Sequence, residues 1–159
     1  MVTDDEIRFL EKAIDLSLKG MKEGKGGPFG CVIVLNDKII GEGYNKVTAI
    51  NDPTAHAEIV AIRNACRRLG SYQLNGCDIY SSCEPCPMCL GAIYWARPER
   101  VIYANTRKDA AAIEFDDDFI YHEISISNSE RKISFIHQPH LKAKEVFDIW
   151  KAMDNRQKY

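Results

Sequence analysis

Two short motifs place an imidazole, a carboxylate and two thiols close to where two helices are expected to begin. The first motif is His56-Ala57-Glu58, and the second is Pro85-Cys86-Pro87-Met88-Cys89. Asp52, ahead of the first motif, is a typical helix cap, and the prolines of the second suit a first helical turn. The sequence therefore favours a fold that brings two helix N-termini to one point, where unpaired amides and the helix dipole favour thiolates.

His56, Cys86 and Cys89 are residue types that bind zinc. Cys86 and Cys89 have i, i+3 spacing, so they share one face of their helix. Three protein ligands leave the fourth tetrahedral position of Zn²⁺ for water, which is typical of a catalytic site rather than a closed structural one. Zinc lowers the pKa of such a water from about 15.7 to about 7. Glu58 is not needed as a ligand, so we expect it to move the protons of this water.

The spacing of His56 and Glu58 raises a geometric difficulty. Residues at i and i+2 of a regular helix point in roughly opposite directions, so both could not face one metal ion. The helix is expected to begin only a few residues before His56. We therefore expect the backbone at His56 to be not yet fully helical.

The cysteines also have ordinary explanations that compete with a catalytic site. A Cys-x-x-Cys pair alone is often a structural zinc half-site or a redox pair. Cys83 would close the site if it also bound the metal, but Glu84-Pro85 directs the backbone away, so we expect three ligands. Cys31, Cys66 and Cys77 lie in apolar patterns and are expected to be small core residues.

The rest of the chain alternates helices and strands, which favours an α/β fold, a three-layer α/β/α sandwich with a mixed central sheet. Helices are expected after a capping box at Thr3, over 54–69, from the second motif to about Pro98, near Asp109 and over 141–153. Strands are expected over 31–35, from Ile39, over 78–82 and over 101–103. The acidic run 116–118 is expected in a loop, with an edge strand after it.

Length and composition indicate one globular domain over residues 1–159. Of its residues, 45% are hydrophobic and 28% are charged. Its length allows a stable hydrophobic core without disulfides or a structural metal. No apolar run is long enough to cross a bilayer, and the acidic start does not resemble a secretory signal. We therefore expect a cytoplasmic protein with reduced thiols. A formal net charge of −2, with scattered basic residues, does not favour a nucleic acid as substrate.

The two motifs together resemble the signature of the cytidine-deaminase-like superfamily, which joins His-x-Glu to Pro-Cys-x-x-Cys. More closely, the chain resembles the bacterial guanine deaminases over nearly its whole length, most strongly at 26–30, 51–58 and 82–96. tRNA adenosine deaminases share part of these stretches. The closer resemblance rests on 94–98, 115–121 and the terminal Tyr159.

This resemblance implies one Zn²⁺ per subunit and the hydrolysis of guanine to xanthine and ammonia. Glu58 would transfer the proton of the water, and Asp117 would be a second proton-transfer group near the departing amine. The residues that would bind the free nucleobase are Asn45, Phe29, Trp95, Ala57 and Tyr159. The resemblance also implies a homodimer, in which the C-terminal segment, about residues 121–159, can be exchanged between subunits.

Three alternatives remain open from the sequence. A tRNA adenosine deaminase would need a basic groove and a C-terminal helix that grips RNA. A cytosine or cytidine deaminase would use the same zinc chemistry with a different pocket. A non-catalytic zinc-binding interaction module would have a fourth protein ligand and no need for Glu58.

Overall fold

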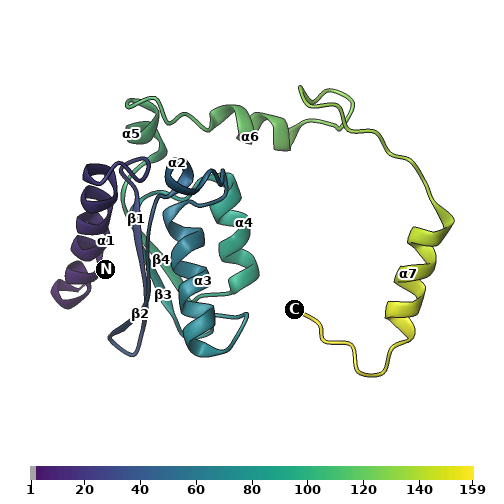
Figure 1. Ribbon diagram of the computed structural model, residues 1–159, viewed down its shortest axis with the longest axis horizontal. Helices are drawn as coiled ribbons and strands as arrows, with labels where there is room; N and C mark the ends of the chain where they lie inside the picture. Colours follow the sequence, from purple (N-terminus) through teal and green to yellow (C-terminus); the bar gives the residue numbers. More distant parts are fainter. Residues whose placement is uncertain (1–2) are drawn as a thin grey trace. The chain divides into compact units, whose positions relative to one another are not determined.

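The computed structural model describes residues 3–159. The chain forms two compact units, one that runs to Asp118 and one from Phe119 to Tyr159. The first unit contains the sheet and both sequence motifs (Figure 1). In the described part of the chain, no helix has the length and apolar character needed to cross a membrane.

The first unit is built around a mixed four-stranded sheet. Its strands are β1 (Gly30–Leu35), β2 (Lys38–Tyr44), β3 (Asp78–Cys83) and β4 (Arg100–Asn105), in the order β2-β1-β3-β4. β1 pairs antiparallel with both β2 and β3, whereas β3 pairs parallel with β4. The mixed sheet expected from the sequence is confirmed.

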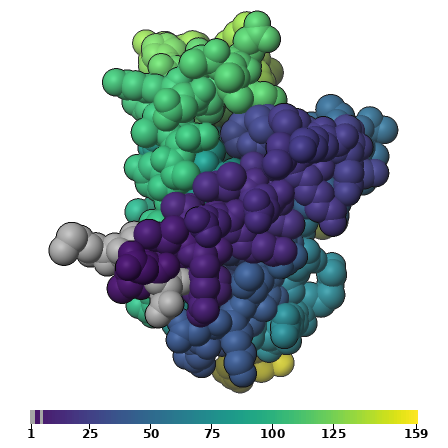
Figure 2. All heavy atoms as spheres, turned by 90° about the vertical axis from the view of Figure 1, so that its left-hand side faces the viewer, coloured from purple at the N-terminus to yellow at the C-terminus, as the bar shows by residue number. Residues whose placement is uncertain are grey.

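Helices cover both faces of this sheet and give the predicted three layers. α1 (Asp4–Lys22) packs against one face, and α3 (Ala57–Leu69) and α4 (Pro87–Ala96) lie on the other (Figure 1). Figure 2 shows α1 lying across the outside of the first unit. The capping box predicted at Thr3 is present, since its side chain accepts from the Glu6 amide and Glu6 accepts in return from the Thr3 amide.

Alternate residues of β1 supply two separate hydrophobic cores. Cys31 and Ile33 belong to the core on the α3 side, whereas Val32 and Val34 belong to the core on the α1 side. All four are buried, as expected for a central strand that is covered on both faces. Cys77 belongs to the α3-side core and Cys66 packs against it, so the prediction of small core residues holds for both.

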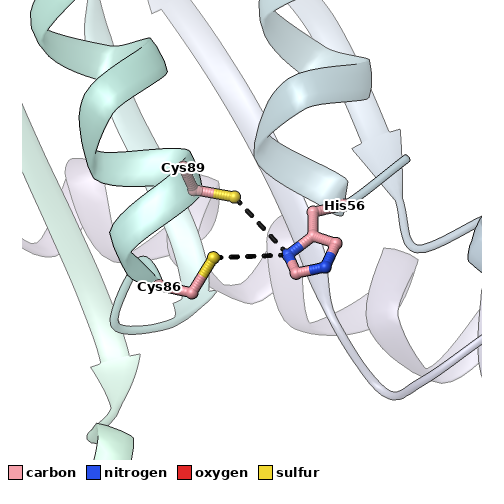
Figure 3. A group of neighbouring side chains, drawn as sticks. All are labelled: His56, Cys86 and Cys89. Carbon is pink, nitrogen blue, oxygen red and sulfur yellow. Dashed lines mark hydrogen bonds between the residues drawn. The ribbon is translucent and has the colours of Figure 1, made fainter. Parts of the chain in front are cut away.

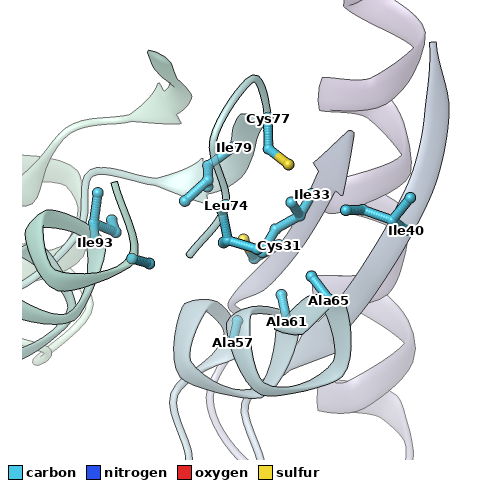
Figure 4. Packing of buried hydrophobic residues seen from close by; sticks show 11 residues of the cluster. Cys31, Ile33, Ile40, Ala57, Ala61, Ala65, Leu74, Cys77, Ile79 and Ile93 are labelled. Atoms are coloured by element: carbon cyan, nitrogen blue, oxygen red, sulfur yellow. The ribbon is translucent and has the colours of Figure 1, made fainter. Parts of the chain in front are cut away.

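α3 lies close to β2 because both elements have small residues at the contact. Ala57, Ala61 and Ala65 follow one another along the face of α3 that belongs to the core (Figure 4). A Cβ atom at Gly43 of β2 would lie 2.2 Å from the Ala57 carbonyl oxygen and 2.6 Å from the Ala61 amide nitrogen. Gly41 is similarly placed, 2.6 Å from the Ala61 carbonyl oxygen. This contact fixes the start of α3, which carries the first motif, against the sheet.

Two helix starts differ from the expectation. α3 begins at Ala57 rather than near residue 54, because the Asp52 carboxylate does not cap it. That carboxylate instead accepts hydrogen bonds from the amide and the hydroxyl of Thr54, which closes a local turn. α4 begins at Pro87, so Pro85 precedes the helix rather than lying in its first turn.

The connections contain helices that the sequence did not fully reveal. A four-residue helix, α2 (Val47–Ile50), follows β2 and was not expected, whereas the short helix expected near Asp109 is α5 (Arg107–Ala111). The edge strand expected after the acidic run is wrong, because this segment forms α6 (Asp118–Ser125). Ile120 and Ile124 within it are spaced as on a helix rather than alternating as on a strand.

The second unit has helical structure but no buried residue. α7 (Leu141–Ala152) forms over nearly the predicted range. Every residue from 119 to 159 is exposed or only partly buried. Several large apolar side chains of this unit are among the most exposed of the chain: Ile136, Leu141 and Phe147. Such a surface is more apolar than a stable monomer usually presents.

We expect Gly43→Ala to lower the free energy of unfolding by about 1–3 kcal/mol, the usual cost of overpacking a filled core. The new Cβ would meet backbone atoms of α3, which cannot rotate away. Gly91→Ala on α4, where a Cβ meets nothing within 4 Å, is the control and should be neutral or slightly stabilising. Urea unfolding of the zinc-loaded proteins measures both, and equal midpoints would contradict the close α3–β2 packing.

Candidate active site

The two sequence motifs meet at the N-termini of α3 and α4. His56 is the N-cap residue of α3 and Cys86 is that of α4, and both have extended backbone with ψ values of 157° and 167°. Cys89 lies in the first turn of α4 and is fully buried. Figure 3 shows the His56 ring facing the sulfur atoms of both cysteines across the gap between the two helix starts.

The extended backbone at His56 removes the difficulty of its spacing from Glu58. Because His56 precedes the helix, its side chain does not follow the helical rotation that would turn it away from Glu58. The Glu58 carboxylate is buried and accepts a hydrogen bond from the Cys89 thiol, with 3.4 Å between Oε2 and Sγ. The expectation that the backbone at His56 is not yet helical is confirmed.

The spacing of these atoms fits a zinc ion. His56 Nδ1 lies 3.5 Å from Cys86 Sγ and 3.6 Å from Cys89 Sγ. Tetrahedral zinc, with Zn–N near 2.05 Å and Zn–S near 2.3 Å, holds nitrogen and sulfur ligands about 3.6 Å apart. The imidazole nitrogen therefore lies at the separation from each thiol that a shared zinc ion requires.

Cys83 stands outside this group of ligands. The described residues whose donor atoms converge here are His56, Cys86 and Cys89. The Cys83 thiol instead donates to the Thr106 carbonyl oxygen, 3.6 Å away. Burial also raises the pKa of this thiol to about 11. These observations support a site with three protein ligands.

Hydrogen bonds and burial shift the pKa values of the site residues. The hydrogen bond between the two thiols lowers the pKa of Cys86 to about 4 and raises the pKa of Cys89. The hydrogen bond with Cys86 raises the pKa of His56. Burial raises the pKa of Glu58. A carboxyl group with a raised pKa exchanges protons more readily near neutral pH, which suits general acid–base work.

A cavity of about 440 Å³ opens beside the ligands, within the size range of small-molecule sites. His56, Cys86 and Glu58 line it, together with Phe29 and Asn45 from the predicted substrate-binding residues. Phe29 immediately precedes β1, and Asn45 immediately follows β2, so neighbouring strand ends place both.

Asn45 is held in one orientation by the start of α2. It is 5% exposed, and its Oδ1 accepts a hydrogen bond from the Val47 amide at 3.1 Å. Since the oxygen of the side chain is used in this way, the amide nitrogen is the end available to donate. The unexpected helix α2 therefore has a direct effect on the site.

Asp117 lines the same cavity from the loop after α5. It is half-buried, whereas Asp116 and Asp118 beside it are exposed. Asp116 accepts a hydrogen bond from the Asp118 amide at 2.9 Å, which bends the loop at this point. Burial, and next the nearby Cys86, raise the pKa of the Asp117 carboxyl group.

Three predicted substrate-binding residues are not among those that line this cavity. Trp95 is 63% exposed on α4, and the Ala57 side chain is buried in the α3-side core. Tyr159 belongs to the second unit. The roles of these three residues stay predictions.

Sequence analysis gave no role to Phe115 and Thr48, which also line the cavity. Phe115 packs against Phe29, with 4.9 Å between the ring centroids. Thr48 lies on α2, and its hydroxyl donates to the Lys25 carbonyl oxygen. The signal for Phe115 was its place at the start of the 115–121 stretch, which is part of the resemblance and contains Asp117, whereas Thr48 had no signal.

Comparison with known proteins identifies the family. Residues 3–105 match the model described as the cytidine and deoxycytidylate deaminase zinc-binding region. The chain belongs to this deaminase family. The deaminase is thus a zinc-dependent hydrolase, and His56, Cys86 and Cys89 form its candidate zinc site.

The deaminase is similar to proteins of two named activities. The guanine deaminase of Bacillus subtilis is 53% identical over 151 residues, which cover 95% of this chain and 97% of that relative. An X-ray structure of guanine deaminase from Bacillus subtilis matches with a TM-score of 0.93, covering 96% of this chain and 97% of the other. The tRNA-specific adenosine deaminase of Aquifex aeolicus is 42% identical over 100 residues, 63% of this chain and 66% of that relative.

Cys86→Ala should lower the zinc content of the deaminase from about one ion per chain to near zero, because it removes one of three protein ligands. Cys83→Ala is the matched control, since it lies on the same segment but outside the ligand group, and it should keep its zinc. Metal analysis of folded protein after a brief chelator wash measures both. Loss of zinc from Cys83→Ala would indicate a closed site with four protein ligands.

Proposed function

We propose that this deaminase hydrolyses guanine to xanthine and ammonia. The observation that carries the proposal is the cavity that Glu58, Asp117 and Asn45 line together with the candidate zinc ligands His56 and Cys86. Its volume suits a free base. Similarity to the guanine deaminase of Bacillus subtilis, which extends well beyond the zinc-binding region, supports guanine as that base.

Glu58 and Asp117 are the proposed proton-transfer groups. Zinc, when bound, supplies a Lewis acid that lowers the pKa of a coordinated water. Glu58 accepts a proton from the attacking water and passes it to a ring nitrogen as the oxygen bonds to C2 of guanine. Glu58 or Asp117 then moves the remaining proton of the added hydroxyl to the amine, so that the C2=O bond forms as the C2–N bond breaks and ammonia leaves. The raised pKa of each carboxyl group supports this exchange.

Substrate binding is proposed for the remaining predicted residues. The Asn45 amide nitrogen donates to the polar edge of the base, and the Phe29 ring contacts its flat face. Ala57 contributes its backbone amide, one of the first four of α3, which have no partner within the helix. Trp95 and Tyr159 are proposed to complete the wall around the base in the assembled enzyme.

A free base, rather than a nucleic acid, is the proposed partner at this cavity. In addition to Glu58, four carboxylates line the cavity: those of Glu84, Glu114, Asp116 and Asp117. Such an acidic lining repels a phosphate backbone. We further propose a cytoplasmic location, which is supported by six free cysteines, two of them zinc ligands.

We also propose a homodimer in which the C-terminal segment, about residues 121–159, is exchanged between subunits. This proposal is supported by the second unit, where no residue from 119 to 159 is buried. On α7, Leu141 is 80% exposed and Phe147 is 77% exposed, and burying such side chains would supply a strong driving force for association. In this arrangement, Tyr159 of one subunit closes the site of the other.

A substrate panel tests the proposed reaction. Zinc-loaded protein is offered guanine, guanosine, cytosine, cytidine, adenosine and tRNA, and ammonia release is measured. We expect guanine to be the best substrate. Glu58→Gln should keep its zinc and lose about 10²–10⁴-fold of the guanine activity, which is the usual contribution of a positioned acid–base group. Guanine among the poorest substrates would refute guanine as the substrate, and wild-type turnover by Glu58→Gln would refute the mechanism.

Mixing two inactive variants tests the exchange. We expect deletion of Tyr159 to reduce guanine turnover strongly, as Glu58→Gln does. If the tail acts in the other subunit, a hybrid dimer has one complete site, and an equal co-refolded mixture should regain about a quarter of wild-type activity, because about half of the dimers are hybrids. Hybrids detected by native mass spectrometry without regained activity would show that the tail acts within its own subunit.

A further inference from the structure

We propose that Phe115 forms a corner of the substrate cavity with Phe29 and selects a two-ring base over a one-ring base. Gly27 leaves the space in which this corner is built. The proposal deepens the proposed function and rests on it, because the selected base is taken to be guanine. All three residues line the cavity.

The backbone after α5 turns Phe115 back toward the cavity. Glu114 has a φ of 71°, and the Phe115 amide donates to the Ala110 carbonyl oxygen at 3.0 Å. A residue in the left-handed region commonly reverses the chain at a helix end. A non-glycine residue in that region needs surrounding contacts to hold it there. The packing of the Phe115 ring against Phe29 is one such contact.

The two phenylalanine rings meet nearly at right angles. Their centroids lie 4.9 Å apart and their planes form an angle of 88°, an edge-to-face arrangement that aromatic pairs prefer. A flat base that stacks on one of these rings, on the side where the two rings meet, therefore lies nearly perpendicular to the other ring. A purine is large enough to contact both walls of such a corner, whereas a pyrimidine stacked at the zinc end leaves part of the corner to water.

Gly27 lies directly beside both rings. A Cβ atom there would lie 2.7 Å from Phe115 Cζ and 3.0 Å from Phe29 Cε2. The contact atoms are the far ends of two side chains, so an added methyl group would displace the rings rather than block folding. Gly27→Ala is therefore a second, indirect way to disturb the position of Phe115.

The experiment compares guanine with isocytosine, which has the amine and carbonyl pattern of the six-membered ring of guanine but lacks the second ring. Phe115→Leu should lower kcat/KM for guanine about tenfold, mainly through KM, and lower the guanine-to-isocytosine preference about fivefold. Phe115→Tyr, which keeps the ring, should stay within about twofold of the wild type. Tyr72→Leu is the control, because Tyr72 is 49% exposed against 46% for Phe115 and lies outside the cavity lining.

The double variant separates contact with the base from a general disturbance. Gly27→Ala should cause part of the same loss of preference, and it should add less to Phe115→Leu than it causes alone, because the smaller side chain removes the shorter of the two ring contacts of the new methyl group. Zinc content and urea midpoints confirm that each variant is folded. Independent, multiplying effects of the two substitutions would overturn the proposal.

Three further outcomes would overturn it. If Phe115→Leu lowered activity on both bases by the same factor, it would act through Asp117 in the same loop and not on the base. If guanine kinetics were unchanged in Phe115→Leu, the ring would not contact the substrate. If the wild type is active, either of these results leaves guanine deamination standing as the proposed reaction. A wild type that deaminates neither base would refute both guanine deamination and the role of Phe115.

Discussion

The backbone contact between α3 and β2 is the constraint on which the active site depends. Gly41 and Gly43 let the helix approach the strand so closely that side chains at these positions would overlap its backbone. The N-terminus of α3 is thereby set directly over the sheet, with His56 at the point where the extended chain enters the helix. A helix held farther away would carry the imidazole out of reach of the thiols of α4.

The chemistry of the site depends on the N-termini of α3 and α4, which are partly shielded from water. Cys86 and Cys89 lie at distances from the imidazole that suit zinc. The same enclosure buries Glu58 and raises its pKa. The convergence of α3 and α4 above the sheet thus has two effects. It brings the metal ligands together, and it prepares the Glu58 carboxyl group for proton transfer.

Sequence reasoning succeeded where the determining interactions are local. The i, i+3 spacing of Cys86 and Cys89, the capping box at Thr3 and the alternation of helices and strands all depend on residues close together in the chain, and the structure agrees with them. It failed at the start of α3, because the Asp52 carboxylate bonds within its own turn. It also missed the place of Phe115, whose partner Phe29 is distant in sequence. No local pattern reports such a contact.

The two faces of β1 contribute to two different hydrophobic cores, which could be changed separately by protein engineering. Cys31 and Ile33 belong to the core beneath α3, whereas Val32 and Val34 belong to the core beneath α1. Thermostability could therefore be raised by refining the packing beneath α1, where Leu16 and Tyr80 complete the core, while the reacting groups keep their places. Changes that raise the stability of an enzyme often lower its activity. In this protein, the residues that could be changed for stability and those that support the active site lie on opposite faces of β1.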